Sequence, residues 1–327
     1  MNKSLENRIF DVDSHTFDKF ALDIFYYQAK NNEVYGKYLD LLKLDFNSVK
    51  RVVDIPFLPI SLFKTHQVSI KGILPEVVFS SSGTTGSETS KHFVASLALY
   101  EESFFRGFKI FYGEPSNYCI LALLPSYLER EGSSLVYMAS KLIELSDHPQ
   151  SGFFLHNRSQ LIETIKELES RKQPTILMGV TFALLDLAKE FNFDFKNTLV
   201  METGGMKGRG EELVRGQVHA ILQNAFGLDA IHSEYGMTEL LSQAYSKGDG
   251  IFYTPPWMRV LVRDPYDPFT ILPNERSGSI NIIDLANIYS CSFIQTDDVG
   301  LVHSDGSFEV LGRMDGSQVR GCNLMAI

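Results

Sequence analysis

The polar stretch from Phe79 to His92 has the residue types that bind phosphate. It reads Phe-Ser-Ser-Ser-Gly-Thr-Thr-Gly-Ser-Glu-Thr-Ser-Lys-His, and more than half of these residues are Ser or Thr. Their hydroxyl groups and unhindered backbone N–H groups are the donors that a polyphosphate requires. The stretch is not a Walker A loop, because no Gly-Lys-Ser/Thr ends it. A flexible linker has a similar composition, but a predicted strand before it (77–79) and a predicted helix after it (93–112) favour phosphate binding.

Four further patches are polar or glycine-rich where a core would be apolar. They are 202–208 (Glu-Thr-Gly-Gly-Met-Lys-Gly), 233–239 (Ser-Glu-Tyr-Gly-Met-Thr-Glu), 296–300 (Thr-Asp-Asp-Val-Gly) and 312–316 (Gly-Arg-Met-Asp-Gly). The first two each follow a predicted strand, and ligands of open α/β sheets bind at the carboxyl ends of strands. Taken alone, the patches at 202–208, 296–300 and 312–316 are also explained by ordinary turns.

Strand-like and helical patterns alternate from the phosphate-binding stretch to about residue 235. The strand-like runs are 118–124, 152–156, 175–180, 197–202 and 230–234, and the helical runs between them are 133–145, 159–171, 182–190 and 211–223. This alternation predicts a largely parallel sheet with covering helices. Two earlier helices are predicted at 17–30 and 34–44.

After Trp257 the pattern changes to short strand-like runs without helices. These runs are 258–263, 279–285, 290–294, 300–303 and 308–311. We therefore expect one domain over 1–327, with an α/β body at 1–255 and a β-rich subdomain and tail at 256–327.

Composition excludes several classes of protein. The 327-residue chain is 44% hydrophobic with a formal net charge of −10, which argues against disorder and against generic binding to nucleic acid or an anionic membrane. Its three cysteines have no regular spacing and predict neither a zinc site nor a disulfide framework. The polar start predicts no signal peptide, and the apolar runs are too short to span a bilayer. We expect a cytoplasmic protein without stable membrane insertion.

In order along the chain, the motifs resemble those of the adenylate-forming superfamily, which includes the acyl-CoA synthetases. These motifs are Ser-Ser-Gly-Thr-Thr-Gly (81–86), Glu-Tyr-Gly-Met-Thr-Glu (234–239), Thr-Asp-Asp (296–298) and Gly-Arg-x-Asp (312–315). Pro-Trp-Met-Arg-Val (256–260), the 202–208 patch and the ending 311–324 resemble more closely the acyl-protein synthetase (LuxE) family. The resemblance covers nearly the whole chain. It implies the α/β fold of the large N-terminal domain of these enzymes, with mostly parallel sheets, covering helices and a β-rich C-terminal subdomain.

The chain also departs from the superfamily pattern. The lysine of the phosphate-binding stretch is displaced to Lys91, and Asp297 replaces the glycine of the usual Thr-Gly-Asp. From the resemblance to the acyl-protein synthetase family, we expect the small C-terminal domain that bears a catalytic lysine to be absent.

The resemblance implies that ATP and Mg²⁺ are used to adenylate a carboxylic acid, with roles for these residues. Ser81, Ser82, Gly83, Thr84, Thr85 and Gly86 cradle the β- and γ-phosphates, with Lys91 as a cationic partner. Tyr235, between Glu234 and Gly236, stacks on adenine beside Gly204 and Gly205. Thr238 contacts the α-phosphate and Glu239 holds Mg²⁺, while Asp298 accepts hydrogen bonds from the ribose hydroxyls and Arg313 braces the ribose. Such groups neutralise phosphoryl charge and align nucleophile and leaving group.

Cys322 differs in its setting from the other two cysteines. Cys119 and Cys291 lie in strand-like runs, whereas Cys322 follows Arg320 and Gly321 in a polar tail. A nearby guanidinium favours the nucleophilic thiolate, although an inert terminal cysteine is the alternative. In the acyl-protein synthetase family a cysteine near the C-terminus accepts the acyl group, and this favours Cys322 as the nucleophile.

The resemblance therefore implies a fatty acid that is adenylated and then carried on Cys322 as a thioester. The final acceptor would be a partner such as a reductase or an acyl carrier protein. Two alternatives stay open. The adenylate could pass directly to coenzyme A, a carrier protein or a small acceptor, or the chain could be a degenerate subunit that binds nucleotide or acyl ligands without turnover.

Overall fold

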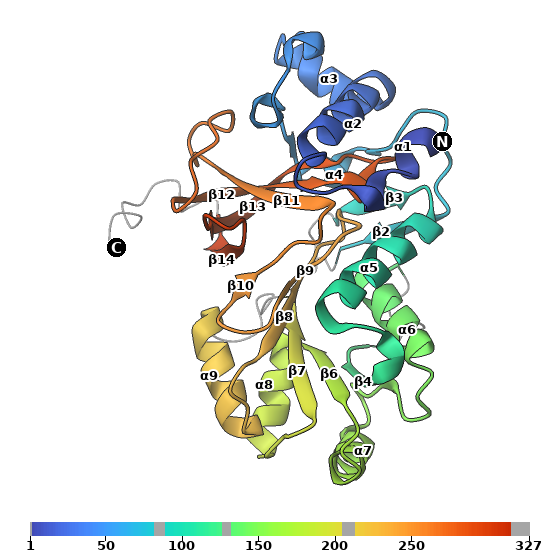
Figure 1. Cartoon of the computed structure of the whole chain (residues 1–327), viewed down its shortest axis with the longest axis vertical. Coiled ribbons are helices and arrows are strands. Elements are labelled where there is room, and N and C mark those ends of the chain that lie inside the picture. Colours follow the sequence, from blue (N-terminus) through green and yellow to red (C-terminus); the bar gives the residue numbers. More distant parts are fainter. Residues whose placement is uncertain (1, 82–88, 126–131, 205–212, 315–327) are drawn as a thin grey trace. The chain divides into compact units, whose positions relative to one another are not determined.

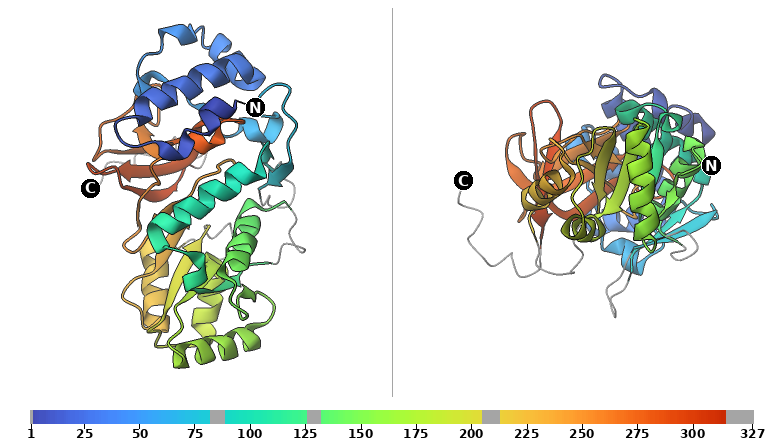
Figure 2. Two further views of the ribbon diagram at one scale, coloured as in Figure 1. Left: turned by 45° about the vertical axis from the view of Figure 1, so that its right-hand side comes forward. Right: turned by 90° about the horizontal axis from the view of Figure 1, so that it is seen from below.

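The structure, a computed structural model, describes residues 2–81, 89–125, 132–204 and 213–314. The chain divides into two compact units, Met1–Leu74 with Pro256–Ile327, and Pro75–Pro255. Figures 1 and 2 show the elements coloured along the sequence. The chain passes from one unit to the other after Leu74 and after Pro255.

The unit Pro75–Pro255 is built on a mostly parallel sheet. Its strands lie in the order β5 (Gly152–Phe153), β4 (Cys119–Leu123), β6 (Thr175–Val180), β7 (Thr198–Thr203), β8 (His232–Tyr235) and β9 (Ala244–Ser246). Neighbours pair in parallel, except that β9 is antiparallel to β8. This confirms the parallel sheet that the alternating pattern predicts.

Helices cover both faces of this sheet. They are α5 (Leu97–Tyr112), α6 (Ser134–Ser146), α7 (Arg158–Ser170), α8 (Thr181–Glu190) and α9 (Arg215–Phe226). Leu121 and Leu177 of the sheet share one buried cluster with side chains of α7, α8 and α9, and Figure 1 shows α5 and α6 on the other side. The helix predicted at 211–223 begins at Arg215. Within the described ranges, no helix is both long and apolar enough to cross a bilayer.

The stretch 79–92, expected to bind phosphate, begins in one strand and ends in another, and no helix follows it directly. Strand β2 (Val77–Ser80) pairs antiparallel with β3 (Lys91–Val94), which places Ser80 opposite Lys91. The predicted helix from residue 93 was wrong at its start. Lys91 is exposed while His92 and Val94 are buried, which is the period of a strand. Ser96 then caps α5, its Oγ accepting from the backbone N–H of Leu99.

The other unit contains an antiparallel sheet in its second segment. Its strands are β11 (Met258–Arg263), β12 (Ser277–Asp284), β13 (Phe293–Val302) and β14 (Phe308–Arg313), each paired with the next. The β-rich character predicted after Trp257 is confirmed. However, the runs predicted at 290–294 and 300–303 are parts of the one strand β13, so Asp297 and Asp298 lie in a strand and not in a turn. Asp297 is exposed and Asp298 is buried, which is the alternation expected within a strand.

The N-terminal segment packs against this sheet. Helices α2 (Phe17–Asn31) and α3 (Glu33–Leu41) lie in it, and β1 (Leu58–Pro59) pairs in parallel with β13. The fully buried Gln28 of α2 donates from Nε2 to the carbonyl oxygens of Asn287 and Ile288, both at 3.0 Å. Its Oε1 accepts from the backbone N–H of Ser292 at 3.0 Å. These bonds explain why the first segment belongs with a sheet more than 200 residues away.

Replacing Gln28 by leucine is expected to lower the free energy of unfolding by about 2–4 kcal/mol, because buried backbone groups would lose their partners. Urea unfolding followed by circular dichroism measures the change. Gln67→Leu is the control, because Gln67 is exposed in the same unit and its replacement should change stability by ~0.5 kcal/mol or less. Equal stability of the two variants would show that the Gln28 bonds do not hold the two segments together.

Candidate functional site

The carboxyl ends of β7 and β8 bring together residues from two of the sequence motifs. Thr203 lies opposite Glu234 in the parallel register, and Thr203 Oγ1 donates a hydrogen bond to the Glu234 carboxylate. Gly204 follows β7 with a φ of 66°, a left-handed conformation that favours glycine. Gly204, Glu234 and Tyr235 therefore share the edge of the sheet at which ligands of such folds bind.

The Glu234 side chain occupies the space beside Gly236. A Cβ atom at Gly236 would overlap Glu234 Oε1 and lie 3.3 Å from Gln243 Cγ, so the Glu234 carboxylate would have to move. The ring of Tyr235 packs edge-on against Phe252, with the ring centroids 5.8 Å apart. Glu234 and Tyr235 therefore each have a defined partner at the end of β8, Thr203 for the carboxylate and Phe252 for the ring.

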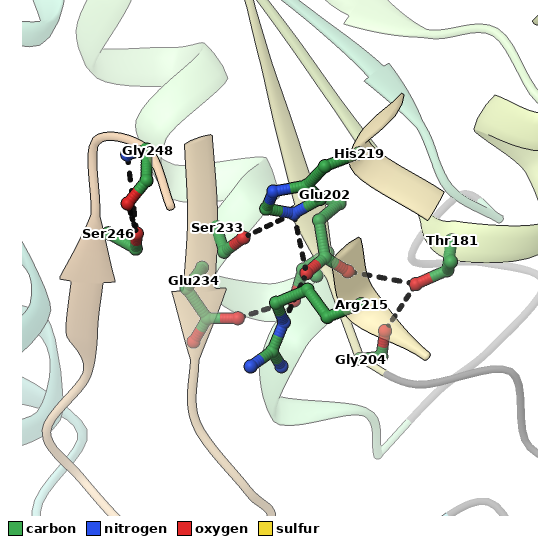
Figure 3. Close-up of polar contacts among 10 residues, drawn as sticks. Thr181, Glu202, Gly204, Arg215, His219, Ser233, Glu234, Ser246 and Gly248 are labelled. Carbon is green, nitrogen blue, oxygen red and sulfur yellow. Dashed lines mark hydrogen bonds and ion pairs between the residues drawn. The ribbon is translucent and has the colours of Figure 1, made fainter. Parts of the chain in front are cut away.

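Glu202, at 5% exposure, is the buried anion of this edge. Thr181 Oγ1 lies 2.9 Å from Glu202 Oε2 and 2.6 Å from the carbonyl oxygen of Gly204. Figure 3 shows these three residues together. Arg215 Nε donates to Glu202 Oε1 at 3.2 Å. Burial alone raises the pKa of Glu202, but the His219 hydrogen bond, the Arg215 charge and the Thr181 hydroxyl together hold that pKa below its usual value. Glu202 is therefore ionised, and Thr181 connects its carboxylate to the carbonyl oxygen of Gly204.

His92 joins the hairpin of β2 and β3 to the segment that carries Thr238 and Glu239. Its Nδ1 lies 2.8 Å from the carbonyl oxygen of Thr238. Because a carbonyl oxygen only accepts, Nδ1 carries the hydrogen. Lys91, directly before His92, is exposed on β3. No role was predicted for His92, because Lys91 and His92 are both polar and the residue types alone do not indicate that His92 is buried.

Glu239, the expected magnesium ligand, is buried one residue after Thr238. Among the residues that the structure describes, no group of three or more His, Cys, Asp or Glu side chains could hold a metal ion. Mg²⁺ is commonly held by one or two carboxylates together with substrate phosphates. A single glutamate next to Thr238 fits a Mg²⁺ ion that arrives with a nucleotide, and it does not fit a metal bound by the protein alone.

Asp298 and Arg313 face each other within the other unit. They are register partners across β13 and β14, and Arg313 Nε donates to Asp298 Oδ1 at 3.1 Å. Asp298 is buried and its backbone N–H donates to Thr296 Oγ1 at 3.2 Å. The structure therefore pairs the two residues to which the sequence analysis assigns ribose contacts, and it separates them from the exposed Asp297.

Several expected site residues lie outside the described residues: Ser82, Gly83, Thr84, Thr85, Gly86, Gly205 and Cys322. At the base of the phosphate-binding stretch, Ser81 is described. Its N–H donates to the carbonyl oxygen of Ser90, and its Oγ accepts from the N–H of Ser90, each at 3.0 Å. These two bonds join the two ends of the described hairpin, Ser81 and Ser90.

The two described cysteines are buried, as expected from their strand-like surroundings. Burial raises the pKa of the Cys119 thiol to about 11 and that of the Cys291 thiol to about 12. Neither thiol forms an appreciable thiolate near neutral pH, so neither is suited to nucleophilic chemistry.

Comparisons with known proteins agree with this fold. The family model described as "Acyl-protein synthetase, LuxE" matches residues 7–326. ATP-bound MatB from Rhodopseudomonas palustris is similar, with 18% identity and a TM-score of 0.54 over 72% of this chain and 47% of that protein. 2-Hydroxyisobutyryl-CoA ligase with 2-HIB-AMP and CoA is similar in an open conformation (13% identity, TM-score 0.65, 95% of this chain and 78% of that one). The same ligase in the thioesterification state is also similar, with 14% identity and a TM-score of 0.66 over 95% of this chain and 71% of that one.

At these identities the solved structures show the fold alone, and they confirm the α/β fold expected for adenylate-forming enzymes. The chain spans about half the length of MatB. No curated protein matches the sequence.

Proposed function

The chain belongs to the acyl-protein synthetase (LuxE) family, and from this premise we propose that it is an AMP-forming ligase that activates a carboxylic acid with ATP. In this reaction a carboxylate oxygen of the acid attacks the α-phosphorus of ATP. The bond from that phosphorus to the bridging oxygen breaks, so pyrophosphate leaves and an acyl-adenylate forms. The observation that supports this most directly is the meeting of Gly204, Glu234 and Tyr235 at the ends of two neighbouring parallel strands.

In the proposed reaction, each group acts on a different part of the nucleotide. Tyr235 stacks on adenine beside Glu234, Gly204 and Gly205, and Asp298 with Arg313 binds the ribose. The phosphates are held by Ser81, Ser82, Gly83, Thr84, Thr85 and Gly86 with Lys91, and by Thr238. Glu239 binds Mg²⁺, which when present neutralises phosphate charge. The His92 bond to Thr238 supports this proposal, because it connects the hairpin of the phosphate-binding stretch to the residue assigned to the α-phosphate.

We also propose that the acid is a medium or long fatty acid and that Cys322 takes the acyl group from the adenylate. The thiolate sulfur attacks the carbonyl carbon, the bond from that carbon to the phosphate oxygen breaks, and AMP leaves with the electron pair. The acyl group then passes to a partner such as a reductase or an acyl carrier protein. The burial of Cys119 and Cys291 supports Cys322 as the nucleophile, because both buried thiols have raised pKa values.

A screen for acid-dependent exchange of labelled pyrophosphate into ATP tests the first step. The assay uses the full chain with Mg²⁺ and a series of carboxylic acids that includes short, medium and long fatty acids. We expect exchange that depends on both the acid and Mg²⁺. Absence of exchange with every acid would favour a subunit that binds nucleotide without turnover.

Asp298→Asn is expected to raise the KM for ATP ~10-fold and to change kcat much less, because a charge-assisted hydrogen bond to ribose contributes mainly to binding. Steady-state exchange kinetics with varied ATP measure both constants. Asp297→Gly is the matched control, because Asp297 is exposed next to the buried Asp298. If Asp297→Gly were the damaging change and Asp298→Asn the silent one, the assignment of this motif would be shifted by one residue.

A further inference from the structure

Tyr235 is connected to the buried carboxylate of Glu202 through two other side chains. Its ring packs edge-on against Phe252, with the ring planes at 60°. The guanidinium carbon of Arg215 lies 4.9 Å from the centroid of the Phe252 ring. Arg215 Nε in turn donates to Glu202 Oε1. A continuous series of contacts therefore runs from the ionised Glu202 to the aromatic ring at the end of β8.

Each contact in this series depends on a particular chemical group. A cation above an aromatic face is attracted by the electrons of the ring, and an edge-on pair of rings has a preferred separation and angle. The planar guanidinium can meet a ring with its face and a carboxylate with its N–H edge, whereas an ammonium group presents only a point charge. Glu202 stays ionised in its surroundings, so it keeps its attraction for Arg215.

We propose that Arg215 and Phe252 are positioning residues that hold the ring of Tyr235 in the orientation needed to bind the nucleotide base. This rests on the proposed function, in which Tyr235 stacks on adenine. Arg215 sits at the first turn of α9 and Phe252 in β10 (Ile251–Phe252). The support for Tyr235 thus comes from outside the Glu-Tyr-Gly motif.

Arg215 and Phe252 could instead stabilise the fold without any effect on the base. A purely structural role would weaken binding of every part of the nucleotide to a similar degree. A positioning role would weaken binding of the base and leave the triphosphate contacts unchanged. The two roles therefore differ in how variants bind ATP and AMP compared with inorganic tripolyphosphate, which lacks the base.

Isothermal titration calorimetry on the full chain tests the proposal with MgATP, AMP and magnesium tripolyphosphate as probes. Arg215→Ala and Phe252→Leu are each expected to weaken the binding of ATP and AMP about three- to tenfold. Tripolyphosphate should bind as it does to the parent protein. Phe252→Tyr keeps the ring and should restore nucleotide binding. The affinity of the double variant for ATP and AMP should fall by less than the product of the two single decreases, because the two residues act through one contact.

Arg158→Ala is the matched control, because Arg158 also forms an ion pair with a glutamate, Glu190, within the same unit. It should bind all three probes as the parent does. If circular dichroism shows that Arg215→Ala does not fold, Arg215→Lys replaces it in the test. Lysine keeps a positive charge beside Glu202 but lacks the planar guanidinium, so this variant should still bind AMP more weakly than the parent does.

The outcomes separate this inference from the proposed function. A parent protein that binds neither ATP nor AMP would overturn both. A parent that binds them, together with Arg215 and Phe252 variants that bind as well, would overturn the inference alone. Equal weakening for ATP and tripolyphosphate would also overturn it, because the two residues would then act through the general fold.

Discussion

Glu239→Ala is expected to lower acid-dependent ATP–pyrophosphate exchange by about 10²–10³-fold, the usual effect of removing one group that stabilises transition-state charge. Charge builds up between the α-phosphorus and the departing pyrophosphate, and the proposed role of Glu239 is to hold the Mg²⁺ that neutralises it. Glu239 is buried next to Thr238, whose carbonyl oxygen is fixed by His92. The backbone directly before Glu239 is therefore hydrogen-bonded to strand β3.

A second variant separates the charge of Glu239 from its packing. Glu239→Gln keeps the volume of the side chain but loses the charge, so it should also lose exchange while its circular dichroism and melting temperature stay near those of the parent. Higher Mg²⁺ should recover part of its activity. Glu144→Gln, an exposed glutamate of the same unit, should be silent. Full exchange in a folded Glu239→Gln protein would remove the metal assignment.

The parallel sheet is predictable from the sequence because its strands are buried on both faces. All five residues of β4 are buried, and so are the first five of the six in β6. Each gives a continuous apolar run that a polar or glycine-containing segment ends. The helices between them show apolar residues at helical spacing on one side. Local patterns of this kind carry enough information to place the elements of an α/β sheet.

Strands that carry polar residues on one face were harder to predict. The polar pair Asp297-Asp298 interrupts the apolar run of β13, so one strand was predicted as two. The short strand β3 begins with Lys91 and His92 and was predicted as part of a helix. In both places the strand is fixed by pairing with a neighbour: β14 pairs with β13, and β2 with β3. Such pairing is not visible in a local pattern.

In the candidate site too, residues in short motifs were predicted from the sequence, whereas contacts between residues distant in sequence were not. Gly204, Glu234 and Tyr235 were found from short motifs at strand ends. The bond from His92 to Thr238 joins residues 146 positions apart, and the contact of Arg215 with Phe252 joins a helix to a separate strand. Nothing in the residue types alone pairs these side chains, so their roles became visible only in the fold.

Cys322→Ser is expected to keep ATP–pyrophosphate exchange and to abolish covalent labelling of the protein by radioactive fatty acid with ATP. Nucleophilic catalysis divides the reaction into formation of the mixed anhydride and its attack by a thiolate, and only the second step needs the cysteine. Cys322 follows Arg313 by nine residues, which span at most ~30 Å when extended. Arg320 favours the thiolate, and Gly321 allows close approach of the backbone.

The chemistry of the label and the two other cysteines provide the controls. In the parent protein neutral hydroxylamine should release the label, because the bond is a thioester. Cys119→Ser and Cys291→Ser should still be labelled if they fold, because both thiols are buried and their pKa values are raised to about 11 and about 12. Normal labelling of Cys322→Ser would exclude this residue as the acyl carrier. If the parent is never labelled but forms acyl-CoA when coenzyme A is added, the adenylate is passed directly to its acceptor, and the acyl-cysteine step does not occur.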